Sequence, residues 1–556
     1  MKLFRNQIAK VAKVGILSAF LLAGQSCENV LEEDVISLIG NNYINTPSGL
    51  TDAVNSAYTT MRAWYGTERG NNFTIFGTDT YTNGSDGSWK FMNTYTGDFD
   101  SQNGHIRELW EEFYRGINTC NAVIERAAAV TGMPEALKKQ RVAEAKFIRA
   151  HHYFIFTQLF GAVDLRLTET LAPTKEVSRS TVQAQYAAII KDLDEAIPDL
   201  ENRGRSNDFG RATRAAAQHL LGKVYLTKAT SEAKAADDYQ KAIPLLQSVI
   251  NNYGLRLLPD FADVHRQGNE MNDEVVWSVQ YTRSPLTNGG GNNAHVFFLM
   301  EYDTQAGMQR DTENGRPFRR YRVTEYTTEV IFKDRVNDSR YKKTFVDVYF
   351  SNRPGSYSTS FDTSKPRVTF ARGDTAIFLP GFEMSVQERA TKRYQVLVPS
   401  RYDERLFPSL RKHIDGQRVD RTQFEGGRDY IAFRLADTHL MLAEAQFFAG
   451  QVAAATTTIN TLRRRAAFPG RQAAMEITAG QLNLEFITEE RERELTGEQM
   501  RWLDLKRWGI LIERVQKYNK QGAANIKPHH VLRPIPQTQI DNAEGAAAGF
   551  SQNIGW

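Results

Sequence analysis

Histidine, carboxylate and serine patterns that are typical of catalysis or metal binding are incomplete in this sequence. His151–His152 and His529–His530 are adjacent pairs, and neighbours on a helix point to different faces, so neither pair has the spacing of two zinc ligands. The stretches at 77–87 and 98–104 are rich in Asp, Asn and Gly, but they lack the alternating spacing of a calcium loop. No nucleophile elbow, phosphate-binding loop or dinucleotide fingerprint occurs. We therefore expect no catalytic residue, no cofactor and no metal site.

Carboxylates are densest in ITEERERELTGEQMRWLDLKRWG, residues 487–509. Glu489 and Arg493 are one helical turn apart, and this spacing predicts an ion-paired helix face. Two carboxylates about 5–9 Å apart would suit glycoside hydrolysis, but such a pair can come from anywhere in a chain and no pattern points to one. We interpret the segment as structural.

The remaining chemistry lies in aromatic side chains set among Gly, Asn and Thr. A sugar ring has an apolar face that stacks on Trp or Tyr, and a rim of hydroxyls that hydrogen-bonds to Asn, Asp, Gln and Arg. Residues 64–105 and 284–305 supply both kinds of group. The candidate ligand-binding residues are Trp64, Tyr65, Tyr81, Asn83, Trp89, Asn292, Asn293 and Tyr302. The alternative is that these side chains form small cores that hold long loops closed.

Helical periodicity dominates the segments that must position these loops. Within residues 431–450 one apolar stripe recurs in steps of three and four, and Gly450 follows as a helix C-terminal signal. The stripe consists of Phe433, Ala436, Leu440, Ala443 and Phe447. Residues 451–466 follow as a second helix that packs back on the first.

Similar helix pairs occur earlier in the chain, 143–161 with 182–200 and 214–229 with 237–254. Small residues on the first helix and a Tyr-x-x-Ala-Ile pattern on the second resemble tetratricopeptide pairs, although their spacing is too irregular for a continuous solenoid. We predict at least four pairs.

The predicted fold class is mainly α, with a tetratricopeptide-like helix-pair scaffold and a long irregular, loop-rich region that contains short strands. Residues 27–556 form a single domain. Its expected parts are a helical scaffold at about 40–260 and 430–520, an irregular ligand-binding region mainly at 64–105 and 281–430, and a docked C-terminal tail at 528–556. Phe550 and Trp556 in this tail offer large apolar areas for docking.

The net charge and the N-terminal residues limit the possible partners and location of the protein. The chain has 69 Lys and Arg against 65 Asp and Glu, a net charge of +4, and no basic stripe, so we expect no nucleic-acid partner. Residues 1–26 read as a lipoprotein signal peptide, because a basic segment precedes an apolar run at 14–23. Ser26 and Cys27 follow this run, so Cys27 is the predicted lipidation site, although Gly24 stands where Leu is usual. The other cysteine, Cys120, is expected to be buried.

Five segments resemble the SusD/RagB family of outer-membrane nutrient-binding lipoproteins and occur in that family's order. They are AKFIRAHHYFIFTQLFGAVDL, GRATRAAAQHLLGKVYL, RLFPSLRKHIDG with FRLADTHLMLAEA, ERERELTGEQMRWLDLKRWG, and LRPIPQTQIDNA with FSQNIGW. Together with the signal peptide, the resemblance spans nearly the whole chain. The tail departs from the family pattern at Gln539, Ile554 and Trp556. We expect these differences to affect only how the tail packs.

The resemblance implies a function without catalysis. Such proteins sit on the cell surface over a SusC-like TonB-dependent outer-membrane barrel, capture an oligosaccharide or polysaccharide, and act as a lid that delivers it to the barrel. The helices typically face the barrel and the irregular region carries the ligand site. The alternatives are capture of oligopeptides or another nutrient by the same lid mechanism, a glycan hydrolase, or a helical scaffold with no small ligand.

The lipidation site can be tested directly. Cys27→Ala removes the thiol to which the lipid would be attached, so we expect the full-length protein to move from the membrane fraction to the soluble fraction. The acyl chains hold the wild type because each buried methylene contributes about 0.8 kcal/mol. Fractionation should use cells without the partner barrel, and Cys120→Ala is the matched control. Membrane retention of the Cys27→Ala protein in those cells would contradict the signal-peptide prediction.

Overall fold

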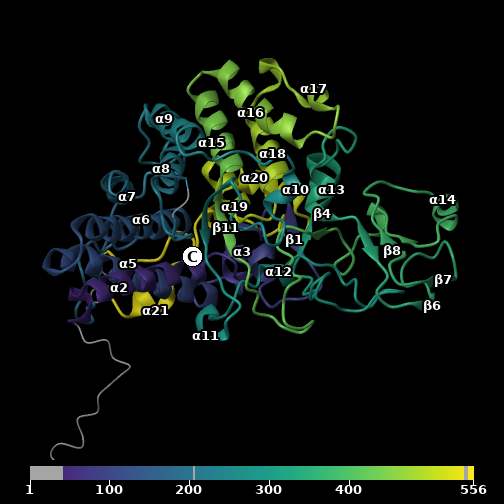
Figure 1. The fold of residues 1–556 in the computed structure, drawn as a ribbon, viewed down its shortest axis with the longest axis horizontal. Coiled ribbons are helices and arrows are strands. Elements are labelled where there is room, and N and C mark those ends of the chain that lie inside the picture. The colour runs from purple at the N-terminus through teal and green to yellow at the C-terminus, as the bar shows by residue number, and fades with distance from the viewer. Residues whose placement is uncertain (1–41, 205–206, 544–548) are drawn as a thin grey trace, which may run out of the picture.

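Long helices pack together in one part of the molecule, and short strands joined by loops form the opposite side (Figure 1). The structure is a computed structural model that describes residues 42–204, 207–543 and 549–556. Within these residues no strand exceeds five residues, and the predicted mainly α fold class is confirmed. The predicted signal peptide and Cys27 lie outside the described residues. None of the described helices is long and apolar enough to cross a membrane.

The long helices pack in pairs. The pairs are α6 (Glu135–Phe160) with α7 (Val182–Ala196), α8 (Arg214–Lys228) with α9 (Asp238–Asn251), α15 (Leu435–Phe448) with α16 (Val452–Ala466), and α2 (Pro47–Thr59) with α5 (Gly104–Arg126). The first three are those that the periodicity predicts. Small residues permit close approach, since a Cβ at Gly222 on α8 would lie 2.6 Å from a methyl carbon of Leu246 on α9.

One boundary differs from the prediction. Phe433 belongs to strand β11 (Tyr430–Arg434), which pairs antiparallel with β2 (Val275–Val279) and places Phe433 opposite Trp277. The prediction that Phe433 begins the helical stripe is therefore wrong. The backbone is extended because β2 supplies its hydrogen-bond partners, and a partner about 155 residues earlier in the chain leaves no local signal.

The loop-rich N-terminal stretch contains more regular structure than its composition suggests. Helix α3 (Glu68–Thr74) begins after Thr67, whose hydroxyl accepts from the Gly70 N–H. Strand β1 (Tyr81–Asn83) pairs antiparallel with β3 (Tyr321–Val323). Two loop regions about 240 residues apart are therefore joined at this ladder.

The strands at the right of Figure 1 enclose a second, smaller hydrophobic core. A three-stranded sheet consists of β5 (Val348–Phe350), β8 (Thr375–Phe378) and β9 (Gln395–Val396), and β6 (Gly355–Ser358) forms a hairpin with β7 (Arg367–Phe370). Tyr302, Ile377 and Phe407 lie in this core. The remaining short strands are β4 (Phe345–Val346) and β10 (Ser409–Leu410), which pair with each other.

Shorter helices connect these parts. They are α4 (Phe91–Thr94), α10 (Phe261–Val264), α11 (Pro285–Asn288), α12 (Ala294–Phe297), α13 (Arg340–Thr344), α14 (Val386–Ala390), α17 (Gln472–Met475), α18 (Leu484–Leu495), α19 (Arg501–Arg507), α20 (Leu511–Tyr518) and α21 (Gln537–Asp541).

Helix α18 carries the carboxylate-rich segment, and its ion pairs are largely buried. The predicted pair between Glu489 and Arg493 is present at 3.1 Å. Glu494, the next residue of the same helix, is fully buried. It pairs with Arg434 of β11 at 2.8 Å, with Arg340 of α13 at 3.2 Å and with Arg465 of α16. A single carboxylate thus joins four elements.

Arg434 is the main cation of this network. Its guanidinium meets Glu274 at 3.0 Å and Glu498 at 2.6 Å, in addition to Glu494, and it also donates to the Glu494 carbonyl at 2.7 Å. Charge-assisted hydrogen bonds of this kind have strict geometry, so the network fixes how the loop region meets the helical scaffold. We refer to Glu274, Arg340, Arg434, Arg465, Glu494 and Glu498 as the ionic core.

The C-terminal residues lie against α5 and the end of α6. Phe550 is buried and meets the ring of Trp110 edge to face at 6.4 Å. The Asn553 amide donates to the Phe160 carbonyl at 3.1 Å. The indole N–H of Trp556 donates to two backbone carbonyls, at 3.1 and 3.3 Å. The last residue of the chain is therefore held by directed contacts.

We expect Glu494→Gln to lower the free energy of unfolding by about 3 kcal/mol at pH 7, because the buried guanidiniums lose their shared counter-charge. Burial would raise the pKa of Glu494, but Arg465 and Arg434 lower it from 4.5 to about 2. The stabilisation is therefore present above pH 4.5 and is lost as the pH falls towards 2. Urea unfolding of both proteins at several pH values should show the difference between them shrinking over this window.

Glu476→Gln is the matched control for this measurement. Glu476 pairs with Arg464 at 3.0 Å, but both side chains are more than 40% exposed, and such pairs contribute about 0–1 kcal/mol. Equal effects of the two substitutions at pH 7, or a constant difference between wild type and Glu494→Gln at every pH, would contradict the role given to Glu494.

Candidate functional site

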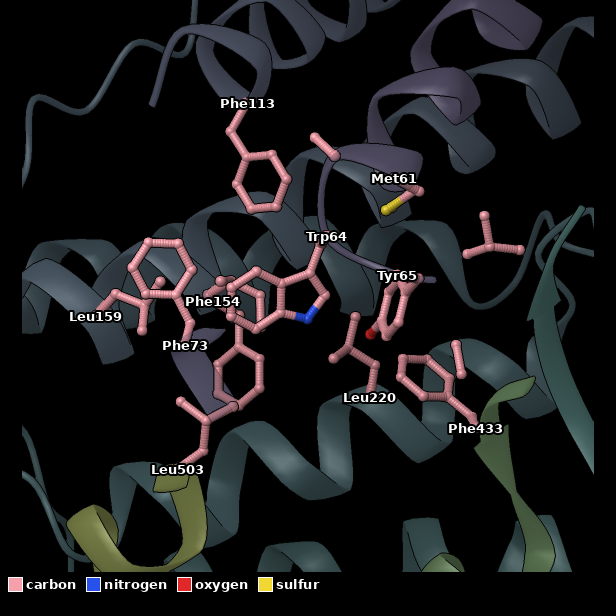
Figure 2. Close-up of a cluster of buried hydrophobic side chains, with 14 of the residues drawn as sticks. Met61, Trp64, Tyr65, Phe73, Phe113, Phe154, Leu159, Leu220, Phe433 and Leu503 are labelled. Carbon is pink, nitrogen blue, oxygen red and sulfur yellow. The ribbon is translucent and has the colours of Figure 1, made fainter. Parts of the chain in front are cut away.

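Two of the predicted ligand-binding residues belong to the main hydrophobic core. Trp64 is 1% exposed and stacks on Phe73 with 5.9 Å between ring centres. Figure 2 shows Trp64, Tyr65 and Phe73 among the other side chains of this buried cluster. The Tyr65 hydroxyl lies 3.0 Å from Nε2 of His151, and its ring packs between core side chains. Both side chains are buried, and in this structure they pack the core as the alternative reading of these aromatic residues expects.

Four further candidates hold loops closed. Tyr81 and Asn83 lie in the β1–β3 ladder and are buried. Tyr302 is fully buried, and its hydroxyl donates to the Gly315 carbonyl at 2.6 Å. The Asn292 amide donates to the Arg428 carbonyl at 2.8 Å. In the structure these four side chains support the loops, as the alternative of small loop cores expects, because long irregular segments need side chains to satisfy and cover their backbone.

Trp89 and Asn293 remain partly exposed. The Trp89 ring stacks on His105, the second residue of α5, with 3.6 Å between ring centres and 24° between planes. Asn293 is anchored by its backbone N–H, which donates to the Gly66 carbonyl at 2.7 Å. For these two residues a ligand contact stays a prediction, and they locate the candidate site.

A second aromatic pair lies at the same surface and was missed from the sequence. Phe318 and Phe424 are both partly buried, and their rings stack with 5.4 Å between centres and 15° between planes. The guanidiniums of Arg316 and Arg320 lie over the Phe318 ring at 5.0 and 4.9 Å. The signal in the sequence is RPFRR at 316–320, a Phe among three arginines.

Helix α12 holds the two segments that carry Phe318 and Phe424. The Phe318 N–H donates to the Val296 carbonyl and the Arg320 N–H to the Phe297 carbonyl, each at 2.9 Å. A ring nitrogen of His295 lies 2.9 Å from the Phe424 carbonyl. One short helix thus fixes both segments that carry the aromatic rings.

Arg320 connects the two aromatic pairs. The Gly84 N–H donates to the Arg320 carbonyl at 2.9 Å, and a Cβ at Gly87 would come within 3.3 Å of the Arg320 side chain. Gly87 also has a φ of +101°, a conformation that favours glycine. The Arg320 guanidinium pairs with Glu68 of α3. We call Trp89, His105, Arg320, Phe318 and Phe424 the aromatic strip.

Electrostatics keep the imidazole of the strip neutral. Burial, together with the positive charges of Arg69 and Arg320, lowers the pKa of His105 to about 3. The pKa of Glu68 is raised, because burial outweighs the effect of Arg320. His105 is therefore an uncharged stacking partner for Trp89 near neutral pH.

The strip offers two kinds of contact to a ligand. Partly exposed aromatic rings can cover an apolar face, and the guanidinium groups beside them can donate to hydroxyl or carbonyl oxygens. Within the described residues no group of three or more His, Cys, Asp or Glu side chains is placed to hold a metal ion. The adjacent histidines His151 and His152 instead bond Tyr65 and Thr60 inside the core.

Comparison with known proteins places this arrangement in one family. The sequence profile described as "SusD family" matches residues 273–556, more than half of the chain, and a profile described as "Starch-binding associating with outer membrane" matches residues 33–226. The SusD-like protein P25 of Formosa agariphila is 24% identical, over 96% of this chain and 97% of its own. The starch-binding protein SusD of Bacteroides thetaiotaomicron is 25% identical, over 76% and 74%.

Solved structures agree on the fold. A SusD homologue from B. thetaiotaomicron superposes with a TM-score of 0.71 and 21% identity, covering 93% of this chain and 98% of its own. A laminarin-binding SusD-like protein superposes with a TM-score of 0.66 and 23% identity, covering 92% and 100%. The profile match and this shared fold show that the chain belongs to the SusD family, whose members are non-catalytic binding proteins of the outer-membrane surface.

Proposed function

We propose that the protein captures a glycan at the aromatic strip and delivers it to a SusC-like TonB-dependent barrel in the outer membrane. The observation that carries the proposal is the strip itself, which consists of two partly exposed aromatic pairs and Arg320. The Arg320 guanidinium lies over the Phe318 ring, and its side chain lies near Gly87, two residues before Trp89. Rings and guanidinium match the apolar face and the hydroxyl rim of a sugar. Structural relatives described as laminarin-binding and as surface glycan-binding proteins support the ligand class.

The proposed location is the cell surface, with the chain anchored by a lipid on Cys27. The described chain begins at Asn42 and leads directly into α2, so the predicted anchor would attach at the helical part of the molecule. This part would then face the membrane and the barrel, as the family resemblance implies. Shallow stacking contacts are individually weak, and a polymeric ligand that offers many equivalent sugars compensates for this by raising the local concentration.

We expect Trp89→Ala to raise the dissociation constant for a bound glycan about tenfold. Covering about 55 Å² of one ring face contributes about 1.4 kcal/mol, which corresponds to that factor. Calorimetry should compare laminarin, starch, xylan and pectin oligosaccharides with a casein peptide digest. Phe318→Ala should act in the same direction, because it removes the other aromatic pair.

Phe382→Ala is the matched control, since Phe382 is 57% exposed but lies outside the strip. It should leave the affinity unchanged. Peptide binding without glycan binding would favour the alternative ligand class. Unchanged glycan affinity in both Trp89→Ala and Phe318→Ala would place the ligand elsewhere on the protein.

Delivery requires a complex with the barrel. We expect the full-length protein, purified from detergent-solubilised outer membranes, to carry a TonB-dependent barrel in about equal amount, as identified by mass spectrometry. The Trp89→Ala protein should retain the barrel, because the strip is assigned to ligand and not to the complex. Recovery of the wild type without any barrel would contradict delivery and leave capture as the function.

A further inference from the structure

A cavity lies near the aromatic strip and has a different chemical character. It encloses about 500 Å³ between α10, α13 and the segment 411–417. Phe261 and Ile414 provide apolar surface in its lining. The volume lies in the range of ligand sites that hold small molecules.

Positive charge dominates this cavity. Five cationic side chains line it, and the acidic side chains in the lining are Asp263 and Glu313. Burial lowers the pKa of His265, which also lines the cavity, to about 4, so this imidazole adds no charge near neutral pH. The five cations are Arg266, Lys343, Arg411, Lys412 and Arg428. An excess of positive side chains in the lining favours anionic ligands.

The inner cations are fixed by the interior of the protein. The Lys412 ammonium lies 2.6 Å from Glu498, a member of the ionic core, and Arg428 pairs with Glu270 at 2.8 Å. Both cations also donate to backbone carbonyls, Lys412 to that of Glu494 at 2.8 Å. Lys412 and Arg428 are therefore held in place, and their charges already have partners within the protein.

The outer cations are held more weakly. The Arg411 side chain is 49% exposed and stands 3.7 Å from Asp347, and the Arg266 side chain is 64% exposed and pairs with Asp263. Exposed pairs of this kind are weak, so an incoming anion can replace them at little cost. Lys343 pairs with Asp260 at 2.9 Å, and Asp260 does not line the cavity.

The cavity and the strip share two chain segments. Glu313 lines the cavity and Arg316 lies on the Phe318 ring, three residues further on, a separation of at most about 10 Å. Arg418 ties this segment to the one that carries Phe424, because it donates to the Thr312 carbonyl at 3.3 Å and to the Gln423 carbonyl at 3.0 Å. An extended saccharide bound on the strip can therefore reach the cavity.

We propose that this cavity is an acid-recognising subsite, which takes the carboxylate or sulfate group of an acidic sugar. Arg411 and Arg266 bind the anionic oxygens at the mouth, and Ile414, which is partly exposed, covers the apolar part of the sugar. The inference deepens the proposed function, and it rests on that function for the saccharide nature of the ligand.

The test compares three tetrasaccharides by calorimetry with the whole protein at low and high salt. Laminaritetraose is neutral, tetragalacturonate carries carboxylates, and a carrageenan tetrasaccharide carries sulfates. We expect one of the two acidic ligands to bind, with an affinity that falls at high salt, and the double variant Arg266→Gln/Arg411→Gln to weaken it about tenfold. The acidic ligand that binds identifies the anionic group.

Arg464→Gln is the matched control, an arginine of similar exposure (43%) in a surface pair on α16. It should change no affinity, and thermal melting should show that the double variant keeps its fold. If neither acidic ligand binds, or if the double variant binds the acidic ligand as the wild type does, the inference is wrong. Binding of laminaritetraose that is lost in Trp89→Ala would still support the proposed function in either case.

Discussion

The burial of Glu494 among three guanidiniums is the constraint on which the rest of the structure depends. An ionised carboxylate inside a protein is tolerated only when opposite charges and hydrogen bonds surround it, and here these come from β11, α13 and α16. Each of these elements must therefore reach its place before the charge is compensated. A second group of buried ion pairs lies on the preceding turn of α18, where Arg491 meets Asp437 at 2.9 Å and Asp504 at 2.8 Å. The irregular half and the helical half are thus held to one another by directed charges in addition to apolar contact.

This arrangement also explains how a binding surface can consist of loops. Loops that carry a ligand site need a rigid support, and the supports here are short elements such as α12 and β3. Most aromatic side chains in these loops are used to support the loops themselves. Tyr302 stacks on Tyr349 inside the smaller core, and Tyr81 meets Phe298 edge to face. Rings that this packing does not cover, such as those of Trp89 and Phe318, stay partly exposed at the surface.

The helical scaffold could be predicted from the sequence, whereas most of the candidate site could not. Apolar residues three and four apart define α6, α8 and α15 locally, so periodicity finds them. The place of Phe433 in a strand depends on β2, and the burial of Tyr81 depends on β3, both far away in the chain. Composition pointed to loops that are rich in aromatic residues, but whether a ring in them is covered is decided by such distant partners. Of the eight candidates, Trp89 and Asn293 kept an exposed surface, and Phe318 and Phe424 drew no attention because they lie among charged residues.

The C-terminal tail bears on the order in which the chain can fold. Trp110 and the end of α6 come from the first third of the sequence, yet Phe550 and Asn553 from the last eight residues cover them. The early helices therefore cannot complete their packing until residues 549–556 have been synthesised. Completion of this packing is consequently a late event in folding.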